Sequence, residues 1–389
     1  MIARATPILA AVALLLAGNG LLGAALPGRW LREGIDAGTI AALGSATYFG
    51  VLLGAVFAIA LVFRLGSGRA AGLFALLFAG STLALAAVST PGPLALLRLT
   101  GGFGLAGLTL LIESALNARA APTKRGRLLA IYMVVFYLAQ AAGAALSGPA
   151  GGSLALAAGA ILLSALPLAR AGIAAPAASN GLAGAASVPR LAQRGTLAGF
   201  SAGLLLGTFY ALAPLAAREA PGAFMAAAMA GGVAGLLPIG AAADRHGPMP
   251  VLVAAYLGVA LASAWLVASS WSGEPASLAA GFAFGLGGFS CYPLASAALN
   301  RTAAPKARLA VNGRLILVSG LGGCLGPLAA AALTPRCGPA AGFVVIGSAT
   351  AITAALIALP RSFFQPERRT GDQQPRRDHD PVVSPWPPR

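Results

Sequence analysis

The chain has 389 residues, of which 58% are hydrophobic and only 9% are charged, and its mean hydropathy is +0.83. A soluble domain needs many more charged residues to cover its surface, so this composition excludes a soluble enzyme or binding protein. The formal net charge is +16, but Arg outnumbers Lys 24 to 2 and Ala and Gly are abundant. This bias indicates genome composition rather than a nucleic-acid-binding surface. We therefore expect a polytopic helical protein in a lipid bilayer, with no nucleic-acid partner.

Apolar runs of about 20 residues recur from the N-terminus onward, and each is long enough to cross about 30 Å of hydrocarbon as a helix. The first run follows Arg4 and also fits a signal peptide, but it is long for one and it completes the first set of helices. We therefore expect it to be retained. Breaks at Pro, Gly and charged residues separate the runs. The twelve predicted spans are 7–26, 39–63, 70–90, 93–115, 128–148, 153–170, 196–216, 222–243, 249–269, 276–299, 309–333 and 339–360.

Two segments lack the apolar pattern. Residues 171–195 are rich in Ala, Gly and Ser and predict a central cytoplasmic linker, and residues 361–389 are rich in Pro, Arg and Asp and predict a disordered tail. The linker separates an N-terminal six-helix bundle, 1–170, from a C-terminal one, 196–360. The predicted fold class is thus all-α integral membrane, with twelve transmembrane helices in two pseudo-symmetric six-helix bundles.

The basic residues are distributed unequally between the two sets of predicted loops. About twenty of the 26 fall in the N-terminus, the even-numbered turns, the linker and the tail. Only four fall on the other side: Arg29, Arg32, Arg218 and Arg336. Because cytoplasmic loops carry the excess of Lys and Arg, both termini are expected in the cytoplasm.

An eight-residue segment occurs twice. Residues 115–122 (ALNARAAP) return as residues 298–305 (ALNRTAAP), with six identities and a separation of 183 positions. Arg64-Leu65-Gly66 and Arg245-His246-Gly247 form a second correspondence, 181 positions apart. A repeat close to half the chain length indicates two similar halves, as in many membrane transporters.

Three motifs carry a family resemblance. Residues 240–247 (GAAADRHG) resemble the G-x-x-x-D-R-x-G loop motif of the major facilitator superfamily, with Gly240, Asp244, Arg245 and Gly247 in the motif positions. Residues 98–104 (RLTGGFG) resemble its R-x-x-x-G-x-G helix motif, through Gly102 and Gly104. Arg125-Gly126-Arg127 fits the R-G-R turn into its fifth helix. The resemblance covers about residues 5–360, and residues 113–133 are similar to the uncharacterised bacterial YcaD-like branch.

The resemblance implies a gating role for the loop motif. In the family, the motif's acid docks against the start of a helix in the other half and closes the cytoplasmic face. Here only the second copy keeps the acid, Asp244, because Phe63 stands at the equivalent position. A carboxylate near the positive N-terminal end of the fifth helix, beside Arg125 and Arg127, would make a reversible latch. The alternative is a polar turn that fixes topology.

Three charged residues fall well inside the predicted spans: Arg98, Glu113 and Arg314. Burial of a charge at a helix centre costs about 2.5–3.5 kcal/mol on insertion scales, so such residues face a cavity or a partner. Glu113 lies among apolar neighbours that favour a neutral carboxyl group, as a proton carrier needs. The alternative is an ion pair with Arg314 or with the basic turn that follows the span. Arg98 could assist proton or substrate coupling, or its side chain could extend to the membrane–water interface. For Arg314 we expect the side chain to extend to that interface.

Uncharged polar residues predict the lining of the central path. In the family, the first, fourth, seventh and tenth helices line it, and each of these side chains could equally bond a neighbouring helix. The candidates are Asn19, Tyr137, Gln140, Tyr210, Ser290 and Tyr292.

The expected function is secondary active transport of a small molecule by alternating access, with proton-coupled efflux favoured because Glu113 is the single membrane acid. Uptake, facilitated diffusion, and a non-transporting sensor or scaffold are the alternatives. We expect no enzyme, no cofactor and no metal, because three cysteines and two histidines show no ligand spacing. We also expect a monomer in the bacterial inner membrane.

Overall fold

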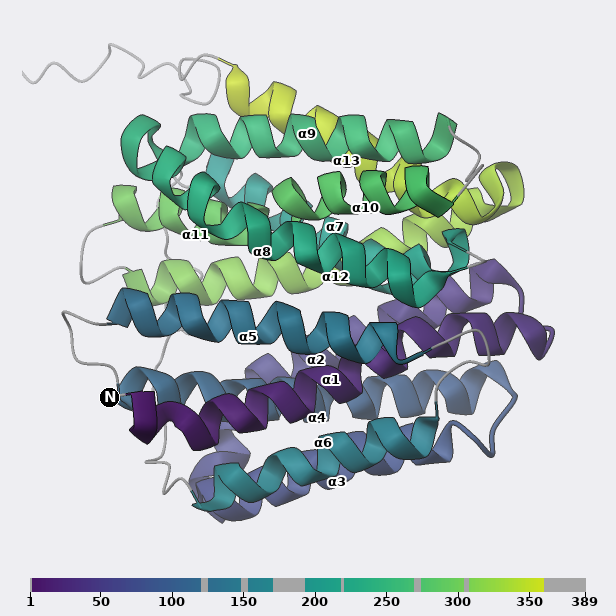
Figure 1. Ribbon diagram of the computed structural model, residues 1–389, viewed down its shortest axis with the longest axis vertical. Helices are drawn as coiled ribbons and strands as arrows, with labels where there is room; N and C mark the ends of the chain where they lie inside the picture. Colours follow the sequence, from purple (N-terminus) through teal and green to yellow (C-terminus); the bar gives the residue numbers. More distant parts are fainter. Residues whose placement is uncertain are drawn as a thin grey trace, which may run out of the picture. The chain divides into compact units, whose positions relative to one another are not determined.

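The long apolar runs of the sequence form long helices. A computed structural model of the chain describes residues 2–119, 125–147, 153–170, 193–217, 220–268, 274–303 and 308–359. Within these ranges every regular element is helical, and the helices run side by side (Figure 1). They are α1 (Ile2–Arg32), α2 (Ala37–Leu65), α3 (Ser67–Ala84), α4 (Pro91–Arg119), α5 (Arg125–Ala145), α6 (Leu154–Arg170), α7 (Gln193–Ala216), α8 (Pro221–His246), α9 (Pro248–Ala268), α10 (Glu274–Gly288), α11 (Cys291–Thr302), α12 (Arg308–Cys337), the 3₁₀ helix η5 (Gly338–Ala340) and α13 (Ala341–Ala358).

The described helices confirm an all-α membrane fold. Ten segments in these ranges are long and apolar enough to cross a membrane. One of them, Val311–Ala358, has 48 residues and contains two predicted spans, and the predicted span 153–170 is a shorter apolar helix, Leu154–Arg170. The linker from 171 to 192 and the tail from 360 lie outside the described residues.

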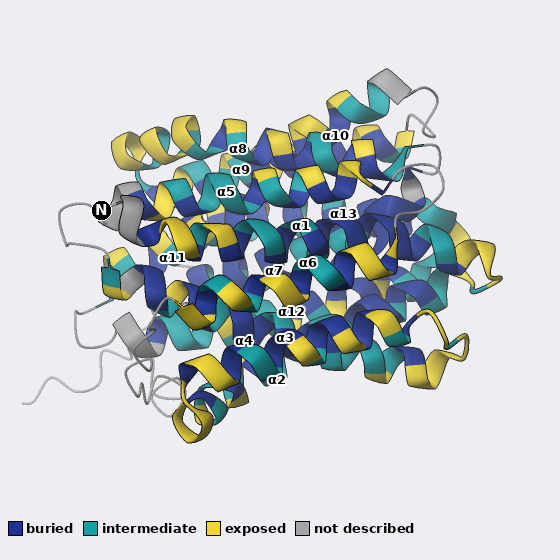
Figure 2. Ribbon diagram, turned by 60° about the horizontal axis from the view of Figure 1, so that its bottom comes forward, coloured by how far each residue is buried: buried dark blue, intermediate teal, exposed yellow. Residues whose placement is uncertain are grey.

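The helices expose apolar side chains on their outer faces, where a soluble protein would place polar ones. Leu237 is 78% exposed and Leu261 is 72% exposed, while Trp30 and Phe209 are buried. Figure 2 shows this division along the ribbon, with buried residues on one face of a helix and exposed residues on the other. Apolar residues exposed on this scale fit contact with lipid tails.

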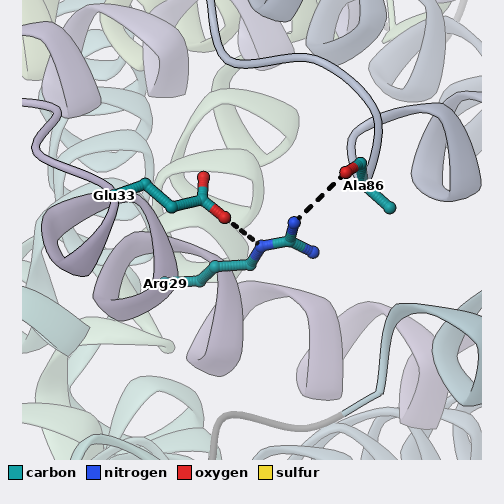
Figure 3. Close-up of polar contacts among 3 residues, drawn as sticks. All are labelled: Arg29, Glu33 and Ala86. Carbon is teal, nitrogen blue, oxygen red and sulfur yellow. Dashed lines mark hydrogen bonds and ion pairs between the residues drawn. The ribbon is translucent and has the colours of Figure 1, made fainter.

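The first helix is longer than predicted. We expected it to end at residue 26, before Pro27, but α1 continues to Arg32. The added turns are held by Arg29, whose Nε lies 2.6 Å from Glu33 Oε1 and whose Nη2 donates to Ala86 O at 3.4 Å (Figure 3). A cation in the last turn also interacts favourably with the helix dipole. The contact ties the end of α1 to the turn between α3 and α4.

The predicted span 276–299 is interrupted. It forms two helices, α10 and α11, joined by a turn at Phe289 and Ser290. Pro293 has no N–H to donate to the carbonyl of Phe289, four residues earlier, and its ring disfavours a continuous helix there. Gly287 and Gly288 directly before the turn weaken the helix further.

Helix contacts follow the same pattern in the two parts of the chain. In the first, α1 packs on α5 and α6, α2 packs on α4, and α3 packs on α4 and α6. In the second, α7 packs on α12 and α13, α8 packs on α10, and α9 packs on α10 and α13. Contacts between the two parts are made mainly by α2 with α12 and by α5 with α8.

Four helix pairs approach so closely that both helices need glycine at the crossing. In each pair, a Cβ on either glycine would overlap a backbone carbonyl group of the facing helix. The pairs are Gly20 with Gly143 (α1 and α5), Gly50 with Gly102 (α2 and α4), Gly203 with Gly322 (α7 and α12) and Gly231 with Gly285 (α8 and α10). The pairs correspond between the two parts of the chain, with offsets close to that of the repeated segment. The offsets are 183 from Gly20 to Gly203, 179 from Gly143 to Gly322, 181 from Gly50 to Gly231 and 183 from Gly102 to Gly285.

The repeated segment lies at the ends of α4 and α11. In the second copy, Asn300 Nδ2 donates to Asn312 Oδ1 at 2.8 Å and to Ser296 O at 2.9 Å. These bonds join the end of α11 to the first turns of α12. The side chain of Asn117, the counterpart of Asn300, lies outside the described residues.

Candidate functional site

Arg98 lies on the third turn of α4 and points toward α1. Its Cζ is 5.9 Å from the ring centroid of Trp30, which is only 2% exposed. The guanidinium also interacts electrostatically with the hydroxyl of Tyr48, on α2. Its Nε is buried and makes no hydrogen bond with any described residue. Arg98 is therefore a cation held by an aromatic face inside the protein.

A small cleft of about 10 Å³ lies beside Arg98, between α1, α2, α3 and α4. Asn19, another predicted candidate, lines the same cleft. The structure thus brings together Arg98 and Asn19, which are 79 positions apart in the sequence. The cleft's other polar lining consists of Thr47, Ser81 and Thr82.

Glu113 lies on α4 fifteen residues after Arg98, about 22 Å further along the helix. The hydroxyl of Tyr132, on α5, donates to Glu113 Oε1 at 3.4 Å. The Glu113 carboxylate also interacts electrostatically with Tyr292, on α11. Glu113 is exposed although it lies between these helices.

The alternative ion pair of Glu113 with Arg314 is not formed. Among the described residues, the one ion pair within 4.0 Å joins Arg29 and Glu33. The basic turn after α4 lies outside the described residues. The partners of the Glu113 carboxylate in the described part of the chain are thus neutral hydroxyl groups.

Tyrosines from several helices meet between the two parts of the chain. Tyr48 on α2 donates to Leu206 O on α7 at 3.3 Å. Tyr210 on α7 lies close to Gln140 on α5, and Gln140 is only 2% exposed. These contacts bring the candidates Tyr210 and Gln140 together and place Tyr48, which the sequence reasoning missed, beside them.

The turn between α10 and α11 receives a hydrogen bond from α5. Tyr137 donates to Phe289 O at 3.4 Å, and their ring centroids are 5.0 Å apart. This is the carbonyl that Pro293 leaves without its helical partner. Ser290 is buried in the turn, where its N–H donates to Gly287 O at 3.1 Å. Tyr137 and Ser290 thus lie at one junction of the two parts.

Residues of the loop motif shape the connection between α8 and α9. Gly247 has φ +87°, a left-handed conformation that favours glycine, and Gly66 has φ +76° at the equivalent place between α2 and α3. Asp244 and Arg245 are exposed, and Asp244 forms no ion pair with a described residue. The side chains of Arg125 and Arg127, the predicted partners of Asp244, lie outside the described residues.

Both glycines of the helix motif are packing positions. At Gly102, α4 crosses α2 beside Thr47. A Cβ at Gly104 would lie 2.6 Å from Phe74 O on α3. Either substitution would push α4 away from its neighbours and disturb the wall that carries Arg98.

The sequence reasoning missed the partners of the charged candidates, Trp30 and Tyr132. Trp30 falls beyond the predicted end of the first span, and Tyr132 belongs to the YcaD-like stretch without a role assigned to it. An aromatic or hydroxyl group on a neighbouring span is the kind of partner that a lone membrane charge requires. That requirement is a signal which could have singled them out.

Comparisons with known proteins agree with this fold. The sequence pattern of the Major Facilitator Superfamily matches residues 195–388. An "Uncharacterized MFS-type transporter YcaD" from Salmonella typhi is 30% identical over 322 residues, which cover 79% of this chain and 83% of the relative. The crystal structure of the nucleoside transporter NupG matches 91% of this chain and 98% of its own, with a TM-score of 0.75 and 13% identity. The D-xylose-proton symporter matches 93% and 99%, with a TM-score of 0.69 and 13% identity. At these identities the two structures establish the fold alone.

Proposed function

Because this chain belongs to the major facilitator superfamily and is a multi-pass membrane transporter, we propose that it exports a small molecule in exchange for protons by alternating access. The membrane is the bacterial inner membrane, and both termini lie in the cytoplasm. Glu113 carries the proton. The observation that carries this proposal is the Glu113 carboxylate, which has a hydroxyl partner and no cationic one in the described part of the chain.

A proton carrier must exist in both protonation states during the cycle. An Arg or Lys partner would hold the carboxylate charged, whereas a hydroxyl group can donate to the carboxylate and accept from the protonated acid. Tyr132 is such a partner for Glu113, at 3.4 Å. Tyr292, on α11, is near enough to interact electrostatically with Glu113. Contacts to both parts of the chain allow protonation to influence how the two parts meet.

The helix contacts support an inward-open state. Gly222, at the outer start of α8, packs so closely on Ala144 of α5 that a Cβ would overlap its carbonyl oxygen. Gly240 lies eighteen residues later, five full turns along the same face of α8, and no described residue lies within 4 Å of its Cβ position. α5 and α8 therefore pack tightly near Gly222, whereas no described residue packs on the Gly240 position. By the positive-inside rule the open end is cytoplasmic, the side nearer Glu113.

The unpaired Asp244 is consistent with this state. A latch between Asp244 and the start of α5 would close the cytoplasmic face, and the latch partners would separate when that face opens. We propose that the halves 1–170 and 196–360, joined by the linker 171–195 and followed by the tail 361–389, are the moving bodies. The glycine pairs at equivalent crossings support two bundles with the same internal packing.

The test is a transport screen in proteoliposomes with an imposed pH gradient. The protein is compared with Glu113→Gln and with Glu33→Gln, a matched loss of an acid at the surface. We expect substrate to move against the proton flow in the wild type and in Glu33→Gln, and gradient-driven movement to be lost in Glu113→Gln. Gradient-driven flux that persists unchanged in Glu113→Gln would refute the proton-carrier role. Flux in the direction of the protons would indicate uptake, and flux indifferent to pH would indicate facilitated diffusion.

A further inference from the structure

Arg98, which lines the cleft, and Trp30, which contacts Arg98, carry buried hydrogen-bond donors without acceptors. Arg98 Nε and Trp30 Nε1 are both buried, and neither has a partner among the described residues. The two side chains are in contact, with Arg98 Cζ 5.9 Å from the Trp30 ring centroid. A buried donor without an acceptor costs about 1–3 kcal/mol, and more when it is charged. Two such donors in contact indicate that an acceptor binds there.

Arg98 also has no counter-ion. No carboxylate lies within 4.0 Å of it in the described part of the chain. A guanidinium inside a membrane protein is strongly destabilising unless it is paired or faces a cavity. Arg98 faces a cavity, so a bound anion would supply the missing charge.

The remaining polar groups of the cleft favour a small anion with one charge. The hydroxyl groups of Thr47, Ser81 and Thr82 donate to carbonyl groups of their own helices, at 3.3, 2.9 and 2.8 Å. They leave Asn19, which has no hydrogen bond with the described residues, as the neutral donor that the cleft offers beside Arg98. One guanidinium neutralises one negative charge, whereas a phosphate dianion would bring a second. The enclosed space of about 10 Å³ admits roughly one water-sized group, so a single anionic oxygen can enter it while the rest of a ligand stays outside.

We propose that the Arg98 cleft binds the carboxylate of the transported molecule, with the guanidinium paired to it and the Trp30 indole N–H and the Asn19 amide as further donors. The proposal deepens the transport function above by assigning a substrate class, organic monocarboxylates. Arg98 and Glu113, both on α4, then bind the two transported charges at different depths. Arg98 holds the negative substrate near the outer end, and Glu113 carries the proton near the cytoplasmic end.

The test measures equilibrium binding to the purified protein in detergent, without a gradient, so it does not depend on proton coupling. The probes are benzoate and hexanoate, each against its neutral amide, and methylphosphonate as a phosphate-like anion. Binding is followed by the fluorescence of Trp30 in a variant whose other tryptophans are Phe, and by the thermal shift. We expect both carboxylates to bind at least about tenfold more tightly than their amides and more tightly than methylphosphonate.

The variants assign this preference to the cleft. Arg98→Gln should abolish the preference for carboxylates, and Arg98→Lys should keep part of it, because an ammonium group keeps the charge but not the fork of donors. Arg64→Gln, which removes an exposed arginine at the end of α2, should leave it unchanged. Without probe, Arg98→Gln should unfold at a temperature no lower than the wild type, since it removes an unpaired buried charge.

Three results would overturn the proposal. They are equal binding of acids and amides by the wild type, a carboxylate preference that survives in Arg98→Gln, and tighter binding of methylphosphonate. Failure of Arg98→Gln to fold would show that the charge is structural. In that case Arg98→Lys gives the second test, because a carboxylate preference as large as in the wild type would contradict pairing through the guanidinium fork. The carboxylate preference should persist in Glu113→Gln. Loss of proton-driven flux and loss of anion binding are therefore separate outcomes.

Discussion

Tyr137→Phe should destabilise the protein by removing the hydrogen bond to the turn between α10 and α11. The hydroxyl donates to Phe289 O at 3.4 Å in a buried place, and Pro293 cannot supply the helical N–H that would otherwise reach this carbonyl. The bond is long and its partners are neutral, so we expect a loss of about 0.5–1 kcal/mol in the free energy of unfolding. The aromatic contact of Tyr137 with Phe289 is kept by the new ring.

Pro293→Ala changes this expectation in a defined way. Alanine restores an N–H four residues after Phe289, so the backbone itself can satisfy the carbonyl. In this background Tyr137→Phe should cost almost nothing, and the two substitutions should be coupled by about 0.5–1 kcal/mol in a double-mutant cycle. Tyr256→Phe is the matched control. Tyr256 is buried and donates to Ala198 O on α7 rather than to the carbonyl of Phe289, so its loss should cost the same in both backgrounds.

Reversible unfolding in mixed detergent micelles measures all six proteins. Equal losses for Tyr137→Phe in the wild-type and in the Pro293→Ala background would refute the reasoning, because the carbonyl of Phe289 would then not depend on Tyr137. A coupling as large for Tyr256 as for Tyr137 would show that Pro293→Ala acts through a general repacking of the helices.

Three further predictions concern the outer contact, the carboxylate and a helix cap. Gly222→Ala should separate the outer ends of α5 and α8 and raise the labelling rate of a thiol introduced by Ser147→Cys by about 5- to 150-fold, whereas Gly240→Ala, with free space at its Cβ, should leave it unchanged. Tyr132→Phe removes the donor to Glu113 and should slow proton-driven flux about fivefold, a loss near 1 kcal/mol; an unchanged rate would contradict the role of this hydroxyl. Asp36→Ala should destabilise α2 by about 1 kcal/mol, because Asp36 caps it by accepting from Thr39 N at 2.9 Å. These bonds lower the pKa of Asp36, so the cap stabilises the folded protein at neutral pH, and this stabilisation is lost as the pH falls below about 4 through the folded-state pKa. An Asp36→Ala protein whose free energy of unfolding falls with acid as much as that of the wild type would contradict this.

The helices could be predicted because a membrane span is a local property of the sequence. A run of about 20 apolar residues must satisfy its backbone internally, so its position fixes a helix whatever its neighbours are. The repeat was equally visible, and the glycines of four helix crossings keep its spacing. The break at Phe289 and Ser290 was missed because Pro is tolerated in many membrane helices; here α1 continues through Pro27. Whether a helix continues past a proline depends on contacts with other helices and turns. Arg29 contacts Ala86 at the end of the continuous α1, and Tyr137 contacts Phe289 at the break between α10 and α11.

The candidate site could be predicted only as a set of unusual residues. The sequence singled out Arg98 and Glu113 because charges are rare in a membrane span, and it gave their separation along one helix. It could not supply Trp30 or Tyr132, since these contacts depend on how α4 is rotated against α1 and α5. The alternative of an ion pair between Glu113 and Arg314 depended on that rotation too, and the structure does not form it.

The most direct test of proton coupling at Glu113 compares two kinds of flux through one variant. Proteoliposomes containing Glu113→Gln are assayed for accumulation driven by a pH gradient and for exchange of labelled against unlabelled substrate at equal pH. A permanently neutral side chain mimics the protonated carrier, which in an exchange with protons returns without substrate, so we predict no gradient-driven accumulation and substrate exchange well below the wild-type rate. Accumulation at the wild-type level, or substrate exchange at the wild-type rate, would contradict the assignment of Glu113 as the proton carrier in such an exchange.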